Sequence, residues 1–153
     1  MSIHLIGPRC VPRHPDRPVP LGRGGHPRRR VVYVTNELSG VTVLNAASGT
    51  VEARLATPSP FGVAISPDGA RAYVTGLGPG KLTVIDTRTR KVASTLSVGP
   101  TGTDPFTAQA TGQAIYVVDQ GANTLSVIDP NTLQVAATVP IGNSPYGVAV
   151  VPP

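Results

Sequence analysis

The chain has little of the chemistry that most enzyme sites need. It contains no tryptophan, one cysteine and three histidines. The cysteine and the histidines all lie within residues 1–30: His4, Cys10, His14 and His26. Residues 31–153 therefore have neither a thiol nor an imidazole, which excludes most nucleophilic and zinc chemistry there. A single cysteine forms no internal disulfide, so cysteine usage is compatible with a reducing or an oxidising compartment.

Charge is also sparse and unevenly placed. The formal net charge is +5, but residues 1–30 hold seven arginines against Asp16, while residues 31–153 hold six basic and seven acidic residues. The basic character therefore belongs to the first 30 residues. Their Pro, Arg and Gly content and lack of aromatic residues predict a disordered segment. We expect a passive tail there; the alternative is salt-sensitive contact with phosphates or lipid head groups.

Long apolar runs are absent too. No stretch approaches the length of a membrane span, and no signal peptide is readable, because the first apolar stretch is interrupted by His4. One alternative gives the tail some order. When the sequence is aligned with itself at an offset of 40 residues, prolines and glycines of residues 18–27 match those of residues 58–67. The tail could thus be a degenerate repeat start, with an inner strand at residues 23–26, although Arg23 in a core would be costly.

What the chain does have is a repeat. Similar segments begin at Tyr33, Tyr73 and Tyr116, spaced by 40 and then 43 residues. A period near 40 residues with short β-type segments indicates a repeat architecture. Runs rich in Val, Thr, Leu and Ile, bounded by Gly, Pro, Asn and Asp, predict strands. The expected strands are 31–35, 41–45, 50–56, 62–66, 71–75, 81–86, 91–98, 105–110, 114–118, 124–129, 133–140 and 146–151.

The details of these segments indicate packed sheets. Runs such as Leu82-Thr83-Val84-Ile85 do not alternate cleanly between apolar and polar residues, which predicts sheets covered on both faces. Ser66-Pro67-Asp68-Gly69 has the residues of a type I turn, and Asp86 and Asp129 can accept hydrogen bonds from the turn that follows them. The longer second period predicts a bulge or a longer loop at residues 103–105.

The repeat resembles a known family. Tyr33-Val34-Thr35-Asn36 is the name-giving tetrapeptide of the YVTN-type β-propeller repeat. The family's later segments are matched in order by Val84-Ile85-Asp86-Thr87, by residues 91–99 and by residues 60–69. The resemblance covers residues 31–153. It implies an all-β fold of β-propeller repeats, with four-stranded antiparallel blades, about three of them, in an open or partial ring. It also suggests an extracytoplasmic or cell-surface location.

The copies depart from the family pattern in two informative places. Gly76 and Asp119 replace the Asn of the tetrapeptide, so this Asn is not an obligatory catalytic group in every blade. Residues 147–151 repeat residues 62–66 and would begin another blade. Because a propeller needs about four to eight blades to close, we expect a truncated gene product, or else two chains joined head to tail through unpaired end strands into six blades.

Polar residues that could share one rim of the propeller are the candidate binding residues. They lie in the loops after each YVT strand and in the loops that enter each blade: Asn36, Glu37, Asp104, Asp119, Gln120, Asn123 and Asn143. Four of them could bind a cation through oxygen ligands; we expect solvated loops instead. No catalytic residue, metal site or cofactor is expected. The glycines of residues 76–80 lack the following helix that a phosphate-binding loop needs.

We therefore interpret the chain as a non-catalytic β-propeller binding or scaffolding module, either by itself or as a fragment of a larger propeller. Its partner would be an unknown protein or small ligand, and we do not expect nucleic acid. The alternative is a piece of a propeller enzyme of the lactonase, lyase or quinone-linked dehydrogenase type. The lack of histidine in the repeats argues against the enzyme, since several of those sites use one.

Overall fold

The computed structural model describes residues 3–6 and 31–151, and every element in these ranges is a β-strand. Within them, no helix has the length and hydropathy that crossing a bilayer would require. The strands are β1 Ile3–Ile6, β2 Val31–Asn36, β3 Gly40–Asn45, β4 Val51–Leu55, β5 Pro60–Ile65, β6 Arg71–Gly76, β7 Lys81–Asp86, β8 Lys91–Ser97, β9 Pro105–Ala110, β10 Ile115–Asp119, β11 Thr124–Ile128 and β12 Val135–Pro140.

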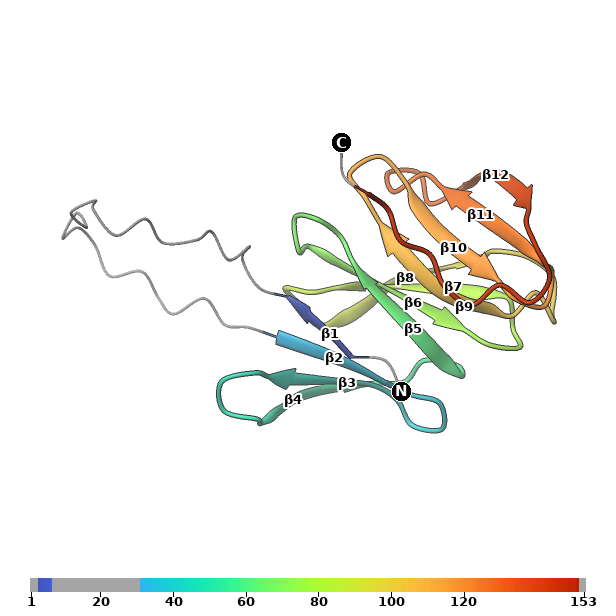
Figure 1. Cartoon of the computed structure of the whole chain (residues 1–153). Helices are drawn as coiled ribbons and strands as arrows, with labels where there is room; N and C mark the ends of the chain where they lie inside the picture. Colours follow the sequence, from blue (N-terminus) through green and yellow to red (C-terminus); the bar gives the residue numbers. More distant parts are fainter. Residues whose placement is uncertain (1–2, 7–30, 152–153) are drawn as a thin grey trace, which may run out of the picture.

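The strands form three four-stranded antiparallel sheets, each made of consecutive strands. We call them blade 1 (β1–β4), blade 2 (β5–β8) and blade 3 (β9–β12) (Figure 1). In each blade the Tyr of the second strand lies opposite a residue of the first strand: His4 is opposite Tyr33 in blade 1, Ala64 is opposite Tyr73 in blade 2, and Gln109 is opposite Tyr116 in blade 3. The three sheets are arranged as successive blades of an open β-propeller.

The hydrophobic core consists of two layers, each between successive blades. Between blades 1 and 2, Tyr33, Val41 and Val43 pack against residues of β5–β7. Between blades 2 and 3, Tyr73, Leu82 and Val84 pack against residues of β9–β11. Because successive residues of a strand point to opposite faces, the central strands of blade 2 contribute to both layers. This explains their nearly continuous apolar runs.

Small residues allow the blades to approach closely. A Cβ atom on Gly62 of β5 would lie 2.6 Å from the carbonyl oxygen of Phe106 on β9. Thr75 Oγ1 accepts a hydrogen bond from the Gly62 N–H (2.7 Å) and donates to the Phe106 carbonyl (2.9 Å). Thr35 Oγ1 donates in the same way to the Phe61 carbonyl (2.6 Å). The Thr of the YVT strand thus connects each of the first two blades to the inner strand of the next blade.

The turns follow the predicted chemistry. Asp68 Oδ1 accepts hydrogen bonds from Ser66 Oγ (2.5 Å) and the Ala70 N–H (3.0 Å). Asp86 and Asp129 each accept backbone hydrogen bonds from the turns that follow them. These bonds to the ionised carboxylates lower the pKa of all three aspartates. The three side chains therefore have structural roles.

The strands predicted between residues 31 and 140 are confirmed, with ends that differ by two residues or fewer. The predicted irregularity near residue 105 is confirmed as a bulge, because Val118 is opposite Thr107 whereas Asp119 is opposite Pro105. The prediction of a strand at residues 146–151 is wrong: this segment forms no ladder. A strand needs a hydrogen-bonded neighbour, and the segment contacts blade 3 instead through the Thr107 hydroxyl and the Phe106 ring.

Within the N-terminal segment that we predicted to be mostly disordered, Ile3–Ile6 are a strand in the structure. These residues form β1, which pairs with β2 so that Ile3 is opposite Val34 and Ile6 is opposite Val31. An apolar segment can take this place because the inner edge of β2 offers unpaired backbone groups. β1 is the inner strand of blade 1. The alternative inner strand considered at residues 23–26 lies outside the described residues, as does the rest of the tail.

Candidate functional site

The loops on one rim carry the polar residues selected from the sequence, and the structure gives several of them internal partners. Asp104 lies before β9 with φ of +48°. Its Oδ1 accepts a hydrogen bond from the Gly78 N–H of blade 2 (2.8 Å), and its carbonyl accepts one from the Gln120 N–H of blade 3 (3.0 Å). Asp104 therefore links the β6–β7 loop of blade 2 to the β10–β11 loop of blade 3 by hydrogen bonds.

Asp119 is buried, with none of its surface exposed. Its Oδ2 accepts hydrogen bonds from Ser126 Oγ (2.6 Å) and Thr124 Oγ1 (3.4 Å), while Oδ1 has no partner. Burial raises the pKa of this carboxyl, and the two hydroxyl bonds oppose that rise in part. A carboxylate in this setting is inaccessible to a ligand on the rim.

The fourth position of the YVTN tetrapeptide has a structural role that explains Asp119. In blade 1, Asn36 Nδ2 donates to Thr42 Oγ1 (3.2 Å) on the adjacent strand. Asp119 and Ser126 occupy the same two positions in blade 3 and make the equivalent bond. In these two blades a polar side chain at the end of the second strand bonds a hydroxyl on the third.

Asn123 closes a turn. It has φ of +58°, a conformation that Asn tolerates better than most residues. Its Oδ1 accepts a hydrogen bond from the Ser144 N–H (2.7 Å), and its carbonyl accepts one from the Ile141 N–H (3.0 Å). These bonds hold the start of the segment after β12. Of the remaining candidates, Gln120 is half-buried, whereas Glu37 and Asn143 are exposed.

The candidate residues do not converge on one centre. Asp104, Asp119, Gln120 and Asn123 belong to the loops of blade 3, whereas Asn36 and Glu37 belong to blade 1. Among residues 31–151, no group of three or more His, Cys, Asp or Glu side chains is placed to hold a metal ion. The rim therefore offers separate contact points.

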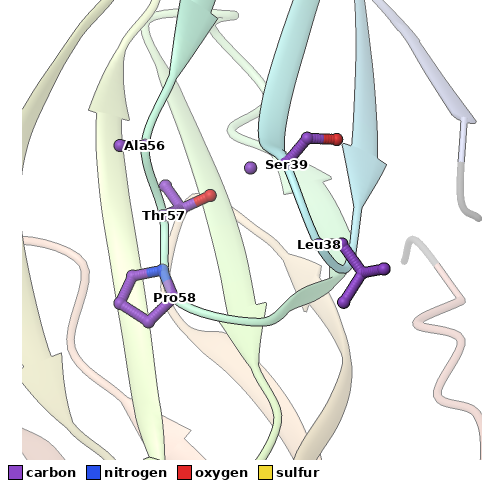
Figure 2. Close-up of a pocket in the computed structure, with 6 residues that line it drawn as sticks. Leu38, Ser39, Ala56, Thr57 and Pro58 are labelled. Atoms are coloured by element: carbon purple, nitrogen blue, oxygen red, sulfur yellow. The ribbon is translucent and has the colours of Figure 1, made fainter.

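A hollow of about 400 Å³ lies beside the β2–β3 hairpin and was not anticipated from the sequence (Figure 2). Leu38 and Ser39 in the hairpin turn line one side, and Ala56, Thr57 and Pro58, between β4 and β5, line the other. Leu38 is 99% exposed, and Thr57 Oγ1 is buried without a hydrogen-bond partner. The sequence feature that could have indicated this hollow is Leu38, a leucine in a turn whose other residues are Asn, Glu, Ser and Gly.

A second hollow, of about 360 Å³, lies on the opposite rim between blades 2 and 3. Its walls include Asp68, Arg71 and Asn131. Arg71 Nη1 donates to the Pro130 carbonyl (2.5 Å), and Asp68 is bonded within its own turn. Its principal charged groups are thus already engaged by the protein.

Comparison with known proteins places the fold among β-propellers. The chain aligns with a chain of hydrazine synthase from Kuenenia stuttgartiensis at a TM-score of 0.67 and 25% identity, covering 76% of this chain and 34% of the other. The dihydro-heme d1 dehydrogenase NirN gives 0.66 and 20%, covering 75% and 26%. The WD40 repeats of RRP9 give 0.63 and 12%, covering 73% and 35%.

These similarities define the class and no more. The chain spans about a quarter to a third of the length of these structures. No protein-family model matches the sequence. No curated protein matches it either. The protein is a three-bladed, open β-propeller unit, similar both to enzyme chains and to WD40 repeats.

Proposed function

We propose that this unit is a non-catalytic binding module built from YVTN-type repeats, and that the hollow beside the β2–β3 hairpin is its contact site. The observation that carries the proposal is Leu38, a large apolar side chain left 99% exposed at the edge of a hollow. Exposed apolar groups beside a concave surface are typical of binding sites. The tetrapeptide at Tyr33, and the matching segments later in the chain, support the repeat type.

The chemistry of the hollow indicates the kind of ligand. Leu38, Ala56 and Pro58 offer apolar contact, whereas Thr57 Oγ1 is buried and out of reach of a ligand. A ligand with an apolar group fits this lining. A leucine-like side chain on a peptide supplies such a group, so a protein segment fits the hollow better than a charged metabolite.

Binding can be tested with N-acetyl-leucinamide as the probe. In backbone amide NMR spectra we expect saturable shifts at Ser39, Gly40 and Thr57, and we expect Leu38→Ser to abolish them. Glu37→Gln, in the same turn, is the matched control and should leave the affinity unchanged. Shifts confined to blade 3, or equal shifts in the Leu38→Ser variant, would show that the hollow is not the site.

The alternative is that the unit is part of a larger propeller enzyme. It draws support from the enzyme names of two similar structures, hydrazine synthase and NirN. Against it, two of the rim carboxylates already have structural partners. Asp104 accepts a hydrogen bond from the Gly78 N–H, and Asp119 accepts one from the Ser126 hydroxyl. An extracytoplasmic or cell-surface location is likewise part of the proposal and depends on the resemblance of the repeats.

A further inference from the structure

The outer face of blade 3 repeats the residues of two faces that are buried in this chain. Tyr33, Val41 and Val43 of blade 1 pack against blade 2. The same positions of blade 2 pack against blade 3. In blade 3 the same three positions hold Tyr116, Leu125 and Val127. The fourth-strand position that holds Leu55 in blade 1 and Leu96 in blade 2 holds Val139 in blade 3.

These blade 3 residues lack the cover that their counterparts have. Tyr73, Leu82 and Val84 are almost completely buried, whereas Tyr116, Leu125 and Val127 are half-buried and Val139 is 44% exposed. The difference is not in residue type, since each position holds the same or a similar apolar side chain. It arises because no blade among the described residues packs on this face. The face is therefore suited to another blade of the same repeat.

Residues 145–151 occupy the place where the inner strand of that blade would begin. Thr107 Oγ1 donates to the Tyr146 carbonyl (3.1 Å), and the rings of Phe106 and Tyr146 are 5.1 Å apart. At the preceding junction the carbonyl of Phe106, the residue equivalent to Tyr146, accepts a hydrogen bond from Thr75 of the second strand β6, and the rings of Phe61 and Phe106 are 4.0 Å apart. In Figure 1 this segment, in red, runs beside blade 3.

The segment has the sequence of an inner strand but no partner strand. Gly147-Val148-Ala149-Val150 matches Gly62-Val63-Ala64-Ile65 of β5. In blade 2, Val63 is opposite Val74, Ala64 is opposite Tyr73 and Ile65 is opposite Ala72. Residues 145–151 form no such ladder. Their backbone groups are available to a strand of the β6 type.

Blade 1 carries the complementary surface. Val32, Val34 and Leu44 lie on the face of blade 1 that points away from blade 2, because they alternate with Tyr33 and Val43. Val32 and Val34 are 9% and 7% exposed in this chain, so the exchange must first uncover them. Their counterparts in blade 2 are Ala72, Val74 and Ile85, which pack on blade 1. Both halves of an inter-blade interface are therefore present on one chain, at its two opposite blades.

We infer that the partner of blade 3 is blade 1 of a second copy of this chain. Residues 146–151 of one copy pair with β2 of the other, in the place that β1 holds here, and the outer faces of blades 3 and 1 pack together. By equivalence with blade 2, Val148 is opposite Val34, and Val150 is opposite Val32. Two such contacts join two copies into six blades, within the four to eight that close a propeller.

The two inner strands compete for one position. β1 pairs with β2 at four positions, and β5, the model for residues 146–151, also pairs with β6 at four positions, so the length of the ladder favours neither strand. The exchange is favoured instead by the second copy, which buries Tyr116 and Val127 of blade 3, half-buried in the single chain. Burial of apolar area favours the exchange. The assembly is independent of the hollow at Leu38, so its failure would not affect the binding proposal.

The mass in solution tests this assembly. We expect light scattering during gel filtration to give twice the chain mass of 15.7 kDa. Val127→Lys, on the outer face of blade 3, should halve the mass with an unchanged far-ultraviolet circular dichroism spectrum. Leu38→Lys, which replaces an equally apolar and more exposed side chain on the rim, should leave the pair intact. A wild-type chain that stays monomeric across a dilution series would overturn the inference.

Disulfide trapping tests the strand exchange itself. In a Cys10→Ser background, the double variant Val34→Cys and Val148→Cys should form a covalent pair on oxidation, because directly opposite residues of antiparallel strands are about 4.5–5.5 Å apart between Cα atoms. Neither single variant should do so efficiently. Oxidation without a cross-link, or a cross-link within one chain, would overturn the exchange. A ladder of larger covalent species would overturn the closed pair.

Discussion

Replacing Asp119 by Asn should stabilise the protein at neutral pH, although Asp119 makes two hydrogen bonds. The carboxyl is completely buried, and Oδ1 has no partner. Ionisation at neutral pH therefore places a negative charge where only Oδ2 is solvated by protein groups, Ser126 and Thr124. An asparagine side chain has the same shape and no charge, and the Asn36–Thr42 pair shows that this site type accepts it.

The sign of the pH dependence follows from the raised pKa. Burial raises the pKa of Asp119 in the folded state, so the folded protein binds this proton more tightly than the unfolded chain does. The stability contributed by the protonated group is fully present below the unfolded pKa, about 3.9. It is lost as the pH rises through the folded pKa. Each unit of difference between the two pKa values is worth about 1.4 kcal/mol.

Urea unfolding of the wild type and Asp119→Asn between pH 4 and pH 8 measures this directly. We expect the variant to be more stable at neutral pH by about 1–2 kcal/mol, the cost of one incompletely solvated buried group, with the difference shrinking towards acidic pH. Asp129→Asn is the control of opposite sign: backbone hydrogen bonds from Asn131 and Thr132 lower the pKa of Asp129, so its contribution is present above the unfolded pKa and is lost as the pH falls. A variant less stable than wild type by the same amount at every pH would refute the reasoning.

Three further substitutions test the packing between and within blades. Thr75→Val should cost about 2–4 kcal/mol of unfolding free energy, because it leaves the buried Gly62 N–H and the partly buried Phe106 carbonyl without their hydrogen-bond partner; a loss below about 0.5 kcal/mol would show that these groups find other partners. Tyr33→Phe should be neutral or stabilising by up to about 1 kcal/mol, because the buried Tyr33 hydroxyl has no partner. Burial raises the pKa of Tyr33 to about 12, so in an ultraviolet titration of the wild type one tyrosine should ionise later than the others. A marked loss of stability in Tyr33→Phe would show that the hydroxyl makes a hydrogen bond after all. Gly40→Ala should destabilise far more than Gly49→Ala: both have positive φ, but only at Gly40 would the new Cβ collide with backbone atoms, and equal losses of denaturation midpoint would exclude the collision as the cause.

Local patterns determined most of the blade architecture. The Tyr at positions 33, 73 and 116 recurs with its apolar neighbours, and turn residues such as Pro67 and Gly69 bound the runs. Strand positions follow from such short-range features, because side-chain alternation and turn propensity act within a few residues. The propeller class and its four-stranded blades were implied by the resemblance to the YVTN repeat. The strands from residue 31 to residue 140 were therefore predictable.

The tertiary structure alone decided what these strands do at their ends. The same tetrapeptide position holds Asn36 with a hydroxyl partner and Asp119 with a buried, half-satisfied carboxyl, and sequence could not distinguish an exposed rim residue from a buried one. Leu38 became a candidate contact only when the segment after β4 was placed across from it. Ile3–Ile6 took the inner edge of blade 1, while residues 146–151 formed no ladder. Each of these outcomes depends on segments distant in the chain meeting in space, so no local pattern records it.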